Sequence, residues 1–108
     1  DIFGEQMKGF AGSGDEFSRG INRFLSANCF GDYYVRAGLS YAQREAVTFC
    51  ILAAQGGCEP QLTSHAAANL RVGNGAQMLK ELVLQMLPYI GYPRALNALA
   101  CLRKACGN

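Results

Sequence analysis

Residues 40–57 read SYAQREAVTFCILAAQGG, and this stretch decides the fold class. Ser40 is followed three residues later by Gln43, which is the capping-box arrangement that opens a helix. From Ala46 to Gln55 the stretch carries no charge, and a helix that is apolar all round is typically buried. Two glycines then end it. We therefore expect a buried helix here.

Helical periodicity also marks the segments on both sides of this stretch. Pro88 and Gly91 bend or end one of them, and Pro93 opens the last. No segment alternates apolar and polar residues over the length of a useful strand. The sequence predicts an all-α fold of about six helices in one compact domain over residues 1–108. We expect these helices over residues 2–10, 15–29, 40–55, 60 to 70 or 72, 77–87 and 93–107.

Composition and charge exclude several classes of function. The chain has 108 residues, half of them hydrophobic, and a formal charge of only +2. Nucleic-acid binders usually show a basic stripe or a recognisable module, and neither is present. The most apolar stretch, 46–54, is far shorter than the roughly twenty residues that span a bilayer. A chain of this size covers less of its surface than a larger one, so we expect association with other copies.

The cysteines are odd in number and widely spaced. Their spacing lacks the dense pattern of a small secreted scaffold, and no pair of cysteines or histidines suggests a zinc site. We interpret most of them as small core hydrophobes in a reducing compartment, and we expect a cytoplasmic protein without a metal. They are Cys29, Cys50, Cys58, Cys101 and Cys106.

A polar stripe follows one edge of the helix expected after Pro60. Gln61, His65 and Asn69 are spaced by four, and Cys58 lies seven residues before His65, so all four share a side. His65 is the only histidine, and histidine is the side chain that ordinarily exchanges protons near neutral pH. It is therefore the candidate for acid–base catalysis. The alternative is a half-buried histidine bonded to a carbonyl.

Two further residues have both a structural and a functional interpretation. Glu45 lies early in the uncharged helix, where the helix dipole favours an anion. Alternatively its carboxylate faces an enclosed cavity, where such a group can carry protons. Cys58 precedes Pro60 at a helix start, where unpaired N–H groups favour a thiolate, whereas the neighbouring Glu59 opposes one. Taken alone, Cys58 is more typical of an inert thiol.

Asp32 and Arg36 are four residues apart in the segment before Ser40. A local ion pair explains both residues. The alternative is that Arg36 presents its guanidinium group to a substrate carboxylate, which its planar geometry suits.

Several segments in the same order resemble the carboxymuconolactone decarboxylase family, an all-helical group that also contains the alkylhydroperoxidase D-like thiol enzymes. The resemblance runs from about residue 17 to residue 105. The segments are GDYYVRAGL at 31–39, REAVT at 44–48, GCEPQLTSH at 57–65, LVLQ at 82–85 and YIGYPRALN at 89–97.

The thiol-peroxidase branch of this family carries a motif that resembles Cys-x-x-Cys-x-x-x-His, with a glutamate on the preceding helix. His65 matches its histidine, Cys58 its first cysteine and Glu45 its glutamate. Gln61 stands where the second cysteine would be, which removes the resolving thiol of a disulfide cycle. A disulfide formed by Cys58 would then have to be resolved by an external thiol or by Cys50.

The decarboxylase branch lacks the cysteine pair and is closer to this chain in the segment 31–39. This resemblance implies loss of carbon dioxide from a lactone acid without metal or organic cofactor. It implies His65 as acid–base group, Arg36 as carboxylate anchor and Glu45 as proton relay. It also implies a homo-oligomer, a trimer or hexamer.

Three alternative functions are therefore considered, and they are given from the most to the least favoured. The first is cofactor-free decarboxylation or proton transfer on a small carboxylated compound. The second is a thiol peroxidase or reductase that uses Cys58, and the third is an oligomeric binding protein without catalysis. Tyr89, Tyr92 and Leu96 are candidates for a subunit interface or a pocket wall.

Overall fold

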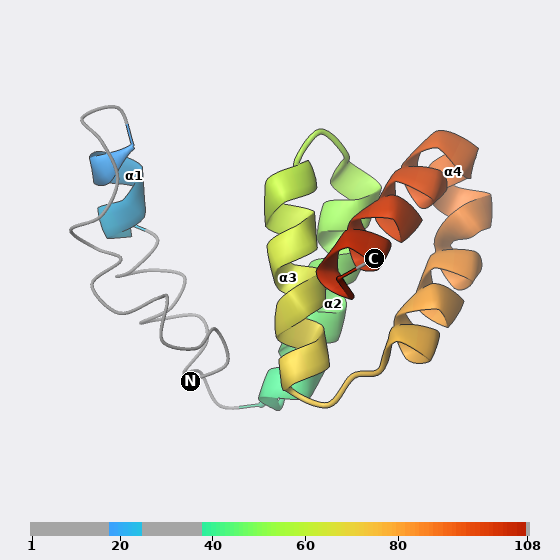
Figure 1. The fold of residues 1–108 in the computed structure, drawn as a ribbon, viewed down its shortest axis with the longest axis horizontal. Helices are drawn as coiled ribbons and strands as arrows, with labels where there is room; N and C mark the ends of the chain where they lie inside the picture. Colours follow the sequence, from blue (N-terminus) through green and yellow to red (C-terminus); the bar gives the residue numbers. More distant parts are fainter. Residues whose placement is uncertain (1–17, 25–37, 108) are drawn as a thin grey trace. The chain divides into compact units, whose positions relative to one another are not determined.

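A computed structural model of the chain describes residues 18–24 and 38–107. Its regular structure in these ranges is entirely helical, which confirms the all-α prediction (Figure 1). The chain divides into two compact units, residues 1–41 and 42–108, and each is described by itself. A single domain over 1–108 stays a prediction. The helices are α1 (Arg19–Phe24), α2 (Tyr41–Gln55), α3 (Glu59–Arg71) and α4 (Ala76–Ala105).

The first unit contributes α1, a six-residue helix with an exposed Ile21. It lies within the helix predicted over 15–29, of which only residues 18–24 are described. The helix predicted over 2–10 lies outside the described residues, as does Arg36.

Helix α2 matches its prediction in length but not in burial. Its buried residues are Glu45, Phe49 and Ala53, which are spaced by four and form one face. Val47 and Ile51 are 48% and 58% exposed, so the prediction of a helix buried all round is wrong. Hydropathy shows that a face is apolar, but burial also needs a neighbouring element to cover it.

Helix α4 replaces two predicted helices, and the helix predicted over 2–10 is outside the described residues, so these residues hold four helices rather than about six. The predicted break is present inside it as a kink, where Gly91 has φ 85° and ψ 167° between Pro88 and Pro93. A positive φ of this size favours glycine, because a Cβ is disfavoured there. Figure 1 shows the result as two helical arms that meet at a bend.

The core of the second unit joins α2, α3 and both arms of α4. Arg94, just after the bend, donates from Nε to the carbonyl oxygen of Gln55 at the end of α2, at 3.4 Å. None of the described helices combines the length and apolarity needed to cross a bilayer. The buried core residues are Phe49, Ala53, Leu62, Ala66, Leu79, Val83, Ala95, Ala98, Cys101 and Leu102.

Candidate functional site: a histidine–glutamate pair between two helices

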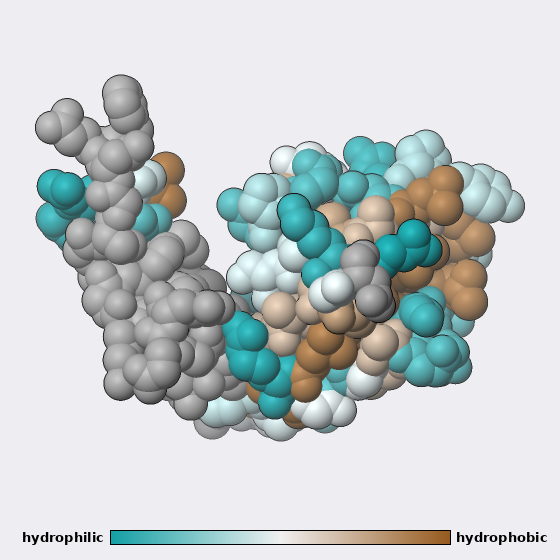
Figure 2. All heavy atoms as spheres, viewed as in Figure 1, coloured by the Kyte–Doolittle hydropathy of each residue, from teal (hydrophilic) through white to brown (hydrophobic). Residues whose placement is uncertain are grey.

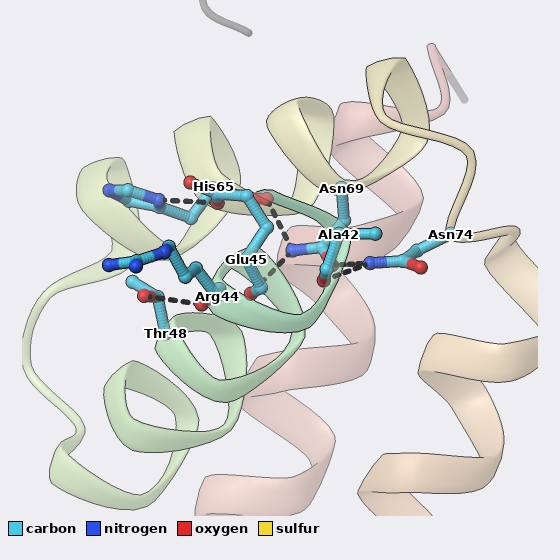
Figure 3. A network of polar contacts seen from close by, with 7 residues as sticks. All are labelled: Ala42, Arg44, Glu45, Thr48, His65, Asn69 and Asn74. Atoms are coloured by element: carbon cyan, nitrogen blue, oxygen red, sulfur yellow. Dashed lines mark hydrogen bonds and ion pairs between the residues drawn. The ribbon is translucent and has the colours of Figure 1, made fainter. Parts of the chain in front are cut away.

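The structure joins His65 of α3 to Glu45 of α2. Nδ1 of His65 lies 2.8 Å from Oε2 of Glu45 (Figure 3). The Glu45 side chain is fully buried, whereas that of His65 remains 15% exposed. The pair therefore links the interior of the helix packing to its surface.

The geometry assigns different tasks to the two ring nitrogens. An ionised carboxylate only accepts hydrogen bonds, so Nδ1 carries the proton in this contact whenever Glu45 is ionised. The other ring nitrogen, Nε2, does not take part in this contact. When Nε2 is protonated, the buried carboxylate of Glu45 stabilises the positive charge on the ring.

Two buried asparagines hold the backbone beneath this pair. Nδ2 of Asn69 donates to the carbonyl oxygen of Glu45 at 2.9 Å and to that of His65 at 2.8 Å. Nδ2 of Asn74 donates to Oδ1 of Asn69 and to the carbonyl oxygen of Ala42, both at 2.8 Å. These bonds connect α2 and α3 at the two residues of the pair.

The roles of both asparagines were missed from the sequence. Asn69 was recognised only as part of the polar stripe, and Asn74 was not singled out. The available signal was chemical, because a buried amide is found where its donors and acceptors are satisfied. An asparagine inside an apolar turn of a helix therefore indicates a partner, although it does not identify that partner.

One oxygen atom of the site can accept a hydrogen bond that the structure does not supply. Oε1 of Glu45 is buried and has no hydrogen-bond partner among the described residues. Burying a carboxylate oxygen without a donor is unfavourable. The carboxylate can therefore accept a further donor while Oε2 holds the imidazole.

Cys58 is not hydrogen-bonded to this pair. It is the N-cap residue of α3, and its thiol donates to the carbonyl oxygen of Leu52 at 3.4 Å. Seven residues separate it from His65, which on a helix is about 10 Å along the axis. Burial, with the charges of Glu59 and Cys101, raises the pKa of the Cys58 thiol. The thiol is therefore protonated at neutral pH.

The remaining cysteines and a possible metal site can be examined in the described residues. Cys50 is a free thiol, as are Cys58, Cys101 and Cys106, and burial raises the pKa of Cys50. Within residues 18–24 and 38–107, no group of three histidine, cysteine or acidic side chains could hold a metal ion.

Arg44 is a cation that the sequence did not single out as a site residue. It directly precedes Glu45, and its carbonyl oxygen accepts a bond from Oγ1 of Thr48 at 2.8 Å. In Figure 3 its side chain extends on the same side as the ring of His65. A guanidinium group on this side suits a negatively charged substrate.

Comparison with known proteins agrees with the sequence. The model of the Carboxymuconolactone decarboxylase family matches residues 20–104. The chain belongs to this family. All residues of the His65–Glu45 site and its asparagines fall within the matched range.

A curated member of known name is also similar. The 4-carboxymuconolactone decarboxylase of Acinetobacter baylyi (strain ATCC 33305 / BD413 / ADP1) is 33% identical over 79 residues. The match covers 73% of this chain and 58% of that relative. The chain therefore spans little more than half the length of this relative.

Proposed function

We propose that this chain is a cofactor-free acid–base enzyme that acts on a small carboxylated compound by decarboxylation or proton transfer. The observation that carries the proposal is the 2.8 Å contact between His65 Nδ1 and the buried Glu45 carboxylate. Family membership and the name of the Acinetobacter relative support the same chemistry.

In the decarboxylation, the bond between the carboxylate carbon and its neighbour breaks and carbon dioxide leaves. The electron pair stays on the substrate as a carbanion or enolate, and Nε2 of His65 delivers a proton to it. Solvent then returns the proton to the ring, so that one proton is consumed per carbon dioxide. Glu45 is the positioning residue that fixes the ring and stabilises its charge. Arg36, outside the described residues, is proposed to anchor the carboxylate.

The test uses 4-carboxymuconolactone, the compound in the name of the relative, and measures carbon dioxide release. General acid–base catalysis contributes about 10²–10⁴-fold, so His65→Ala should lower kcat by a factor in this range. Cys58→Ser is the matched control on the same helix and should leave kcat within about twofold, since acid–base transfer through His65 does not use the thiol. Full turnover by His65→Ala would contradict the proposal, and so would loss of carbon dioxide release in Cys58→Ser, because the thiol would then be required for the reaction. Absence of turnover in all variants would favour the non-catalytic binding protein.

The thiol alternative receives less support from the geometry. The raised pKa of Cys58 lowers its thiolate fraction at neutral pH, and the thiolate is the reactive form. Its hydrogen bond goes to the carbonyl oxygen of Leu52 and not to His65 or Glu45. We therefore keep acid–base chemistry as the first proposal.

We also propose that the chain forms a homo-oligomer, as its family resemblance implies. Val47 and Ile51 form an exposed apolar face on α2, and Tyr89, Tyr92 and Leu96 are exposed around the bend of α4. Exposed apolar residues mark an interaction site where they form one continuous patch. Light scattering after size exclusion should show a trimer or hexamer, and Ile51→Lys should shift it toward the monomer. A monomeric parent chain would contradict this proposal.

A further inference from the structure

The two arms of α4 enclose a groove that the His65–Glu45 site does not use. Its volume is about 480 Å³, which is within the range of small-molecule sites. Leucines from both arms line it, with Leu84 on the first arm and Leu99 and Leu102 on the second. Leu84 is 63% exposed, so the groove presents apolar surface to solvent. Figure 2 shows hydrophobic side chains gathered over α4 beside hydrophilic ones.

The charged residues of this groove are all of one sign. Lys80 comes from the first arm and Arg103 from the second, and none of the acidic side chains in the described residues lines the groove. Neither cation forms an ion pair within the part of the chain that the structure describes. An apolar wall flanked by two cations is complementary to a molecule with an apolar body and one negative group.

We infer that this groove is a second binding site, and that its ligand is an amphipathic carboxylate with an apolar chain. The chain lies between the arms on Leu84, Leu99 and Leu102. The carboxylate lies against Lys80 and Arg103, and the guanidinium group of Arg103 suits its two oxygens. This site is separate from the proposed reaction, because its lining residues belong to α4 and its C-cap Cys106, whereas His65 and Glu45 lie on α3 and α2.

Titration calorimetry with dodecanoate, below its micelle-forming concentration, tests the charge requirement. Lys80→Met and Arg103→Met remove one cation each and should weaken binding by about tenfold per cation. Lys104→Met is the matched control, because this exposed cation follows Arg103 directly and does not line the groove. Dodecyltrimethylammonium, which has the same tail and the opposite charge, should bind at least tenfold more weakly than dodecanoate. Equal weakening in all three variants, or equal binding of both detergents, would overturn the inference.

Cys106 provides a readout of where the ligand binds. Its side chain lines the groove and is exposed, so alkylation of Cys106 should slow when dodecanoate is bound. Cys58, on α3, should be alkylated at an unchanged rate. His65→Ala should retain dodecanoate binding, which separates this site from the proposed catalytic one. An unprotected Cys106 would overturn the inference, as would protection that rises with protein concentration in the absence of dodecanoate, because a second copy would then occupy the groove.

Discussion

His65 and Cys58 lie on the same polar stripe of α3, two turns apart, and their environments differ. His65 meets a buried carboxylate from α2 at 2.8 Å, and two asparagines fix the backbone beneath it. Cys58 meets only a backbone carbonyl, at 3.4 Å, and its pKa is raised. The spacing of a stripe therefore tells which side chains share a face. Whether such a side chain can take part in catalysis depends on the residues of the neighbouring helix that contact it.

The largest expected effect on stability concerns the asparagine network at the His65 end. Asn69→Ala removes a buried donor to the carbonyl oxygens of Glu45 and His65, and it removes the oxygen that accepts a bond from Asn74, so three hydrogen bonds are lost. We expect the free energy of unfolding to fall by about 2–3 kcal/mol. Urea denaturation measures it.

Gln61→Ala is the control for this change, because Gln61 is an exposed amide on the same stripe. It should alter the free energy of unfolding by less than about 0.5 kcal/mol. A similar loss of unfolding free energy in both variants would show that the hydrogen bonds of Asn69 do not contribute more to stability than the exposed amide of Gln61.

The smallest expected effect concerns the Cys58 end. Because the pKa of Cys58 is raised, its thiol stays protonated at every pH below the range in which thiols ordinarily ionise. Its alkylation rate should therefore be low at neutral pH. The rate should rise only as pH increases beyond that range. Alkylation followed by peptide mass spectrometry measures it, and a fast reaction at pH 7 would restore the thiol peroxidase as a serious alternative.

The helices after Ser40 could be predicted because their apolar residues recur at helical spacing and their ends carry Gly, Pro or a capping residue. The interruption near Gly91 could be predicted for the same reason, although a kinked helix rather than two helices results. The exposure of Val47 and Ile51 could not be predicted, since hydropathy does not show which elements pack against a face.

The sequence grouped His65 and Glu45 as residues of one site, and the structure shows the contact between them. Their catalytic roles, and those of Cys58 and Arg36, stay predictions. The role of Asn74 was not predictable, because a residue between two glycines has no periodicity that connects it to a distant helix. Its partners, Asn69 and Ala42, lie 5 and 32 residues away in the sequence.

The central claim is that Glu45 fixes the imidazole of His65 for proton transfer through Nε2. Because the chain has one histidine, its ¹⁵N NMR spectrum contains a single pair of ring nitrogens. In the neutral ring we expect the proton on Nδ1, and we expect Glu45→Leu to abolish this preference. A proton on Nε2 in the unaltered chain, or an identical spectrum in Glu45→Leu, would contradict the account.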